Sequence, residues 1–323
     1  MFFYRQSKVD TEIRVKFIIC LKLCVVERGN KLTIGIIIKG PEGLVLAAES
    51  RITLEVHIGN NQVPVSFDNA RKVLKFSEPN SFVGAVTYGL GGIGLRSAYS
   101  YIPEFESTLP VGQRLSIQDF AQKLSDFFMQ QWIANFPPPA TPTAPATPDN
   151  PTPPAAPTPR IPPMIFVVGG FNDGEPYGRV YQFAIPVAPA PIEQHPSNPS
   201  PVFGITWGGQ REIVDRLITG YDARAIQFAK ACLNLTQQQI AQLKQAFTPL
   251  QMQIPIQLLP LQDCIDLSLF FVRTTIEAQR LTVGIRGCGG NIDIAIITRQ
   301  KGFEWVQQKK LHGEKENKNS VCE

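Results

Sequence analysis

The sequence predicts an α+β fold in which two β-sheets are sandwiched between layers of helices. Two observations lead to this prediction. Short runs rich in Ile, Val and Leu occur in separate groups along the chain, and segments with helical periodicity follow these groups. Because helices and sheets must each bury an apolar face, this order of strands, helices, strands, helices and strand favours a layered architecture.

The first expected strands are the apolar runs 33–39 and 43–49, which the segment KGPEG separates. Gly and Pro in so short a connection predict a hairpin. Both runs are almost continuously apolar, which indicates strands that are covered on both faces. A polar loop containing GNN is expected next, and then strands at 72–76 and 82–88.

Helices are expected at 92–106 and 116–135. In the second segment apolar residues recur at helical spacing, and Ser116 is placed to cap the helix N-terminus. The aromatic residues of this stripe are interpreted as core.

Residues 137–163 form a Pro/Ala/Thr tract. A packed element cannot hold so many prolines, because each ring removes a backbone donor and blocks helix formation. The tract is expected to be an extended surface insertion within one domain. An inert insertion is favoured over a ligand for an SH3-type domain, since P-x-x-P spacing arises by chance in this composition.

The second half of the chain is expected to alternate in the same way. The predicted elements are strands at 164–171, 179–185 and 202–207, helices at 210–219, 222–232, 236–248 (with Thr236 as a possible cap) and 261–281, and strands at 292–298 and 302–306. A single domain is therefore expected over residues 31–306, with a helical insertion near 222–258. Residues 1–30 are interpreted as a leader or a non-native extension, and residues 307–323 as a disordered tail.

The bulk composition argues against several classes of function. The net charge of +4 is spread along the chain, which disfavours nucleic acid as a partner. The six cysteines form no C-x-x-C pair, so neither a disulfide framework nor a zinc site is expected. Reduced cysteines of this kind favour a cytoplasmic location. Three histidines are too few for a metal cluster, and no metal or cofactor is expected. The apolar stretch 17–26 is too short to span a bilayer, so no membrane partner is expected.

Four segments, in the same order, resemble those of proteasome-type subunits of the N-terminal-nucleophile (Ntn) hydrolases. TIGIIIKGPEGLVLAAESR (33–51) is similar to the first hairpin of that family, and RKVLKF (71–76) to its lysine-bearing segment. FVGAVTYGLGG (82–92) looks like its A-x-x-G-L segment, and GCGGNIDIAIITR (287–299) resembles its late strand. On this resemblance the sequence is identified as a divergent, bacterial member of the family.

The resemblance implies a four-layer αββα sandwich, self-association into rings, and threonine peptidase activity on peptide or protein substrates. In such chemistry the hydroxyl of an N-terminal threonine attacks the amide, and its own α-amine acts as the base. A buried lysine, held by an acid, keeps this amine neutral, and a backbone N–H stabilises the oxyanion. Carried over onto this sequence, the resemblance assigns the nucleophile to Thr33, the acid to Glu49, the lysine to Lys72 (with Lys75 as the alternative), the arginine after the acid to Arg51, and the oxyanion N–H to Gly89.

The sequence departs from the family pattern at the nucleophile. Counted back from Gly35, the family spacing places the threonine at Lys31, so Thr33 is expected to be displaced by about 6.6 Å along the strand. Thr33 also has no free amine unless the residues before it are absent, for example through translation from Leu32. In the late segment, Cys288 and Ile285 stand where the family places a serine and an acid.

Two functions of different class therefore remain open, and so does enzymatic activity itself. The first is a threonine-type peptidase that cleaves amide bonds. The alternative is a non-catalytic structural or scaffold subunit that lacks the nucleophile. An amidase of another Ntn branch is disfavoured, because such enzymes usually begin with Cys or Ser.

Overall fold

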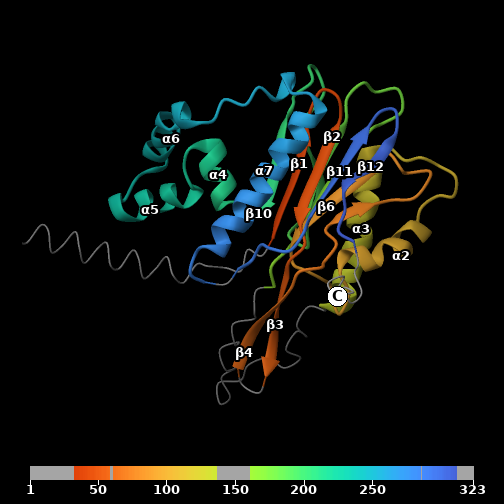
Figure 1. The fold of residues 1–323 in the computed structure, drawn as a ribbon, viewed down its shortest axis with the longest axis horizontal. Coiled ribbons are helices and arrows are strands. Elements are labelled where there is room, and N and C mark those ends of the chain that lie inside the picture. The colour runs from red at the N-terminus through yellow and green to blue at the C-terminus, as the bar shows by residue number, and fades with distance from the viewer. Residues whose placement is uncertain (1–32, 59–60, 137–160, 285, 311–323) are drawn as a thin grey trace, which may run out of the picture.

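A computed structural model describes residues 33–58, 61–136, 161–284 and 286–310. These residues form a mixed α+β fold with two five-stranded sheets and a separate two-stranded hairpin (Figure 1). Every pair of neighbouring strands is antiparallel. The predicted α+β class is thereby confirmed.

The first sheet contains the leading hairpin at its centre. Its strand order is β10 (Gly204–Gly209), β1 (Ile34–Lys39), β2 (Leu44–Glu49), β11 (Ile292–Thr298) and β12 (Gly302–Gln307). All residues of β1 and β2 are buried, as their continuous apolar runs predict. The turn between them closes with a hydrogen bond from Gly40 N to Gly43 O.

The second sheet runs without crossovers from one edge to the other. Its strands are β5 (Val73–Lys75), β6 (Val83–Gly89), β7 (Met164–Gly170), β8 (Arg179–Ile185) and β9 (Ala188–Gln194).

The helices fall into two groups along the chain, and Figure 1 shows α7 lying along the strands of the first sheet. The first group is η1 (Ala98–Tyr101), α2 (Ile102–Ser107) and α3 (Ile117–Asn135), and the second is α4 (Glu212–Thr219), α5 (Ala223–Leu233), α6 (Gln237–Ala246), η2 (Thr248–Leu250), η3 (Ile256–Leu258) and α7 (Leu261–Arg280). Ser116 caps α3 and Thr236 caps α6, as the sequence predicts.

Three hydrophobic clusters hold these elements together. One joins α3 to the second sheet, with Phe128 and Phe166 in ring contact. A second joins α7 to one face of the first sheet, and a third contains residues of both sheets. Successive side chains of β1 alternate between the last two clusters: Ile36 and Ile38 belong to the one with α7, and Ile37 to the one between the sheets. This alternation explains why β1 is apolar at every position.

Three strands and the start of one helix differ from the sequence prediction. The stretch expected to be a polar loop forms the hairpin of β3 (Ile52–Ile58) and β4 (Asn61–Phe67), whose residues 52–58 alternate between apolar and polar. The edge strand β9 was missed because Pro189 and Pro191 lie in it; proline is tolerated at an edge, where no partner needs its N–H. The helix expected from residue 92 begins only at Ala98.

Several sequence predictions fall partly outside the described residues. These are the proposed leader at 1–30, most of the Pro-rich tract, and the tail after residue 310. Order continues past the expected domain end at 306, because Gln307 belongs to β12 and Lys309 is buried. None of the helices in the described part of the chain is long and apolar enough to cross a membrane.

Candidate functional site

Thr33 lies immediately before β1, and it is almost completely buried. Its carbonyl accepts a hydrogen bond from Gln210 N at 2.6 Å, just beyond the end of β10. Its φ is +135°, a value that a β-branched residue adopts only under strain. The start of β1 is thus held in a fixed but unfavourable backbone conformation.

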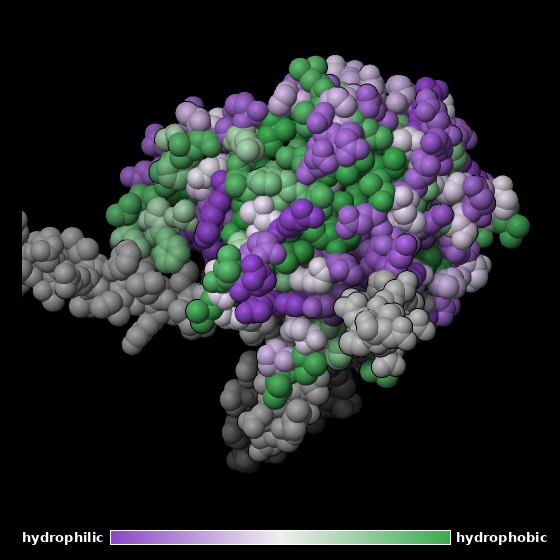
Figure 2. All heavy atoms as spheres, in the orientation of Figure 1, coloured by the Kyte–Doolittle hydropathy of each residue, from purple (hydrophilic) through white to green (hydrophobic). Residues whose placement is uncertain are grey.

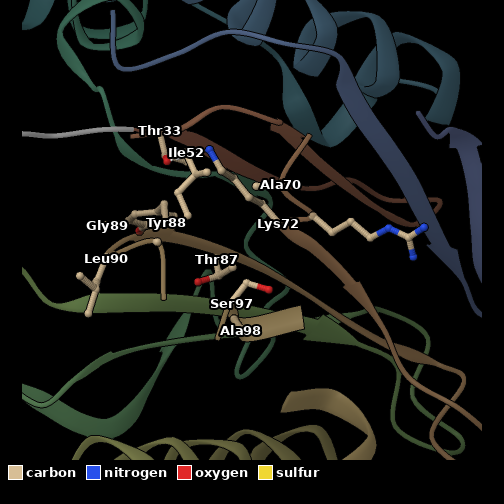
Figure 3. Close-up of a pocket in the computed structure, with 12 residues that line it drawn as sticks. Thr33, Ile52, Ala70, Lys72, Thr87, Tyr88, Gly89, Leu90, Ser97 and Ala98 are labelled. Carbon is tan, nitrogen blue, oxygen red and sulfur yellow. Dashed lines mark hydrogen bonds between the residues drawn. The ribbon is translucent and has the colours of Figure 1, made fainter. Parts of the chain in front are cut away.

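Lys72 contacts both the threonine and the acid, and Figure 3 shows it beside Thr33. Its Nζ donates to Thr33 Oγ1 at 2.8 Å, and also to Glu49 Oε1 and to the carbonyl of Arg51. Lys72 is buried, so its three ammonium protons need acceptors, and these three contacts supply them. The alternative lysine, Lys75, is exposed and lies over the Phe303 ring instead.

Glu49 is the buried counter-charge of Lys72. Its side chain is fully enclosed, and both carboxylate oxygens are occupied. Oε1 accepts from Lys72 and more weakly from Ile34 N at 3.4 Å, while Oε2 accepts from Arg51 N at 2.6 Å and Gly289 N at 3.0 Å. These hydrogen bonds hold the carboxylate of Glu49 in place, and its buried ion pair with Lys72 fixes the lysine beside Thr33.

Arg51 does not contact Thr33. Its guanidinium forms a two-pronged ion pair with Asp68, with Nε–Oδ1 at 2.5 Å and Nη2–Oδ2 at 2.8 Å. This hydrogen-bonded pair lowers the pKa of Asp68 and raises the pKa of Arg51. Arg51 therefore joins the end of β2 to the segment after β4. Its guanidinium lies beside the group formed by Thr33, Glu49 and Lys72 but is not part of it.

Gly89 lies at the end of β6 with a φ of +89°, a conformation that favours glycine. A Cβ at this position would meet the Pro163 carbonyl at 2.3 Å. Gly89, Thr33 and Lys72 line one small cavity of about 20 Å³ (Figure 3). The structure thus gathers Thr33, Glu49, Lys72 and Gly89 in one place, with Arg51 at its border.

Thr33 is not displaced from the site, contrary to the sequence expectation. The count back from Gly35 assumed the spacing of the family, and it placed Thr33 two residues out of register. The 2.8 Å contact with Lys72 Nζ instead shows that Thr33 itself reaches the lysine. Lys31 lies outside the described residues.

Cys288 lies near the site but is not a reactive thiol. Burial raises the pKa of Cys288 well above its ordinary value, and the negative charge of Glu49 raises it further. A thiol is a far weaker nucleophile than a thiolate. Ile285 lies outside the described residues.

Several residues of this region carried no signal in the sequence. Asp68 lies in what was read as a loop, and Gly289 is one glycine among several in GCGG. Lys309 lies within the segment expected to be a disordered tail, and its Nζ donates to Asp293 Oδ2 at 2.5 Å, Ser50 Oγ at 3.0 Å and Ala70 O at 2.7 Å. Only the tertiary fold brings these residues together.

Comparisons with known proteins do not assign the chain to a family. No model of a protein family matches the sequence, and no curated protein does. Among solved structures, the chain is similar to the Anbu (Gly-1) mutant from Hyphomicrobium sp. strain MC1. The match has 16% sequence identity and a TM-score of 0.48, and it covers 88% of this chain and 89% of the other.

The identification of the chain as a proteasome-type subunit is therefore wrong as a family assignment. No family model matches, and a structural likeness at 16% identity does not establish a family. Short apolar runs joined by glycine turns occur in many buried antiparallel hairpins, so four such segments were too weak a basis. The contacts around Thr33 are therefore the basis for assigning a function.

Proposed function

We propose that the chain is a hydrolase that cleaves peptide amide bonds with Thr33 as its nucleophile. The observation that carries this proposal is the 2.8 Å contact between Thr33 Oγ1 and the buried Lys72 Nζ, which the enclosed Glu49 anchors. A threonine hydroxyl needs a nearby base to become a nucleophile. A buried ammonium fixed at hydrogen-bond distance from a hydroxyl is arranged for this kind of chemistry.

In the proposed reaction Thr33 must be the N-terminal residue, so that its α-amine is free. The Lys72 ammonium repels a proton from that amine and keeps it neutral, because like charges in a buried site destabilise each other. The amine takes the hydroxyl proton while Oγ1 attacks the substrate carbonyl, and the tetrahedral intermediate collapses as this proton passes to the leaving amine. Water then hydrolyses the threonine ester, which regenerates the hydroxyl and releases the acid.

The other proposed roles follow from position. Gly89 lines the same cavity as Thr33 and is assigned to the oxyanion, because backbone N–H groups stabilise developing negative charge. Arg51 and Asp68 fix the end of β2, which carries Glu49. The three hydrophobic clusters support a four-layer αββα arrangement of the two sheets and their helices.

The strain at Thr33 favours the removal of the residues before it. A φ angle exists at residue 33 only while a peptide bond joins it to residue 32, so the cost of +135° disappears when Thr33 is the first residue. Translation from Leu32 with removal of the initiator is one route to this form.

The alternative function is a non-catalytic structural subunit. It is favoured if residues before Thr33 are retained in the cell, because Thr33 then has no free amine. Self-association is proposed for either function. It is supported by apolar side chains at the surface around α7 (Figure 2), where Leu258, Phe270 and Leu281 are exposed.

Two measurements test the proposal. The intact mass of the natively expressed protein gives its first residue, and a mass that begins at Thr33 is expected. A peptide epoxyketone, which needs both the hydroxyl and the amine of an N-terminal threonine, is expected to label this form stoichiometrically at Thr33. Thr33→Ala is expected to abolish labelling, whereas Thr206→Ala, a buried threonine of β10 outside the cavity, is expected to retain it. No labelling of a folded chain that begins at Thr33 would favour the structural subunit.

A further inference from the structure

We propose that Ser197 is a second nucleophile of this protein, which accepts an acyl group from an ester with Lys39 as its base. This inference goes beyond the proposed function and does not depend on it, because Lys39 lies at the opposite end of β1 from Thr33. It rests on the contacts of one buried lysine and on the loop that carries the serine.

Lys39 differs from the other buried lysines in the described part of the chain, which are Lys72 and Lys309. Those two each pair with an enclosed carboxylate and donate to three acceptors. Lys39 is completely buried, forms no ion pair with any described residue, and donates only to the His195 carbonyl at 2.5 Å and to Ser197 Oγ at 2.8 Å. An ammonium has three protons to donate, and a buried charge without a counter-charge is costly. Two neutral oxygens therefore favour the neutral amine of Lys39 over its ammonium.

The surroundings of Lys39 agree with this reading. Burial lowers the pKa of Lys39 to about 8 from 10.5. The nearby charges oppose one another: Glu193 and Glu175 raise this pKa, whereas Arg179, which is hydrogen-bonded to both carboxylates, lowers it. Burial also lowers the pKa of His195, so its imidazole is uncharged above about pH 7. Lys39 thus releases its proton near neutral pH, which is the range that a general base requires.

The loop that carries Ser197 holds the hydroxyl against the amine. This loop connects β9 to β10, and Val202 N closes it by donating to the Pro196 carbonyl at 2.9 Å. His195 begins the loop with a φ of +52°, and its ring packs so closely on β10 that a Cβ at Gly204 would meet it at 2.4 Å. Ser197 is only partly buried, and the residues on either side of it are exposed. A reagent must therefore approach from the side of the serine, because the lysine is enclosed.

The proposed step is acyl transfer to the serine. In the neutral state one N–H of Lys39 donates to the His195 carbonyl, and the lone pair accepts the Ser197 hydroxyl, whose hydrogen is free to rotate. Ser197 Oγ attacks the ester carbonyl carbon as its proton passes to Lys39 Nζ. The bond to the leaving alcohol breaks, and the ammonium returns the proton to the alcohol oxygen. Water then attacks the acyl-serine with Lys39 again as the base, which releases the acid and restores the hydroxyl.

The first test uses a biotinylated fluorophosphonate, whose phosphorus Ser197 Oγ attacks with loss of fluoride. The full chain is labelled between pH 7.0 and 9.5, and mass spectrometry of its peptides locates the label and separates Ser197 from Thr33. Labelling at Ser197 is expected, with a rate that rises with pH around a midpoint of about 8. Ser197→Ala is expected to remove the label from this loop. Ser200→Ala is the matched control, because it removes an exposed serine of the same loop, and it is expected to leave the rate unchanged.

The second test separates a base from a residue that merely holds the loop. Lys39→Gln keeps an N–H donor but cannot take a proton, and Lys39→Met removes both properties. Neither variant buries a charge, so both are expected to fold, which circular dichroism checks. The rate of labelling at Ser197 is expected to fall at least about 100-fold in both variants. A rate close to that of the wild type in Lys39→Gln would show that the lysine only holds the loop, and would overturn its role as a base.

Hydrolysis of p-nitrophenyl acetate measures the acyl transfer itself. The part of the rate that Ser197→Ala removes is expected to follow the same pH profile as the labelling, and Ser200→Ala is expected to remove none of it. No labelling at Ser197 in the folded wild type, or a rate independent of pH, overturns the proposal. Each of these results leaves the function proposed for Thr33 standing, and failure of the epoxyketone to label Thr33 leaves Ser197 untouched.

Discussion

Gly289 N donates a 3.0 Å hydrogen bond to Glu49 Oε2, across a separation of 240 residues in the chain. The same glycine accepts from Ser50 N at 3.2 Å through its carbonyl. The segment before β11 thus holds the end of β2, and with it the carboxylate that anchors Lys72. The site around Thr33 depends on the late part of the sequence as much as on the leading hairpin.

Gly289→Ala is expected to disturb this junction. A Cβ at residue 289 would lie 2.5 Å from the Arg51 guanidinium carbon, so the arginine must shift and loosen its two-pronged pair with Asp68. We expect a loss of about 1–2 kcal/mol in the free energy of unfolding, measured by chemical denaturation. Gly289→Ala in an Arg51→Ala background is the control, because the guanidinium that the new Cβ would meet is then absent. An effect no larger than that of the control would contradict the role given to Gly289.

Lys72→Met is expected to abolish labelling of Thr33 by the epoxyketone, with a rate at least about 100-fold lower. The physical reason is the loss of the ammonium beside the hydroxyl. The variant also leaves Glu49 buried without its partner, so circular dichroism must show that the protein is folded. Lys75→Met tests the alternative lysine, which is exposed on the adjoining strand, and is expected to label at the normal rate. Equal rates for the two variants would remove Lys72 from the mechanism.

Lys309→Met is expected to destabilise the fold by about 3–5 kcal/mol, because it leaves Asp293 charged, buried and unpaired. The side chains of both residues are almost fully enclosed. Lys301→Met is the control: this lysine is exposed and its carboxylate partner, Glu304, is 3.8 Å away, so a change below about 1 kcal/mol is expected. Thermal and denaturant unfolding measure both. A neutral Lys309→Met would show that the buried pair contributes no net stability.

Lys39 is expected to make stability rise with pH above about 8. Burial lowers the pKa of Lys39 to about 8 from 10.5, although Glu193 opposes this shift. Between these two values the unfolded chain holds a proton that the folded chain has released, so the free energy of unfolding increases with pH. Below pH 8 both states are protonated and the penalty of burying the ammonium is fully present.

The measurement is the free energy of unfolding at pH 7.5 and 9.5 for the wild type, Lys39→Met and Lys123→Met. Lys123 is exposed on α3 and controls for the loss of one charge. The wild type and Lys123→Met should gain more stability over this range than Lys39→Met. The same gain in all three proteins would contradict the assignment of this window to Lys39.

The sequence predicted most of the elements that carry the site, because local patterns determine them. Continuous apolar runs gave β1 and β2, and helical spacing with Ser116 as a cap gave α3. Glu49 and Lys72 were placed by resemblance to a family to which the chain has not been shown to belong. Their contact with Thr33 follows from the geometry and does not need that assignment.

The remaining parts of the site depend on distant contacts that no local pattern encodes. Asp68 pairs with Arg51 only because β3 and β4 form a hairpin that returns the chain. The position of Thr33 was misjudged because it was counted along the chain with a spacing taken from other proteins. Its contact with Lys72 depends instead on how the strands pack in the folded protein.

The hydrogen bonds of Lys309 also determine when the site can form during synthesis of the protein. Its ammonium joins Ser50, next to Glu49, to the carbonyl of Ala70, two residues before Lys72. A ribosome that has produced the strands of the first hairpin has therefore not yet produced the residue that ties them to the lysine segment. The region around Thr33 is complete only after synthesis has passed residue 309, so a nascent polypeptide that stops before this residue is expected to carry an unfinished site.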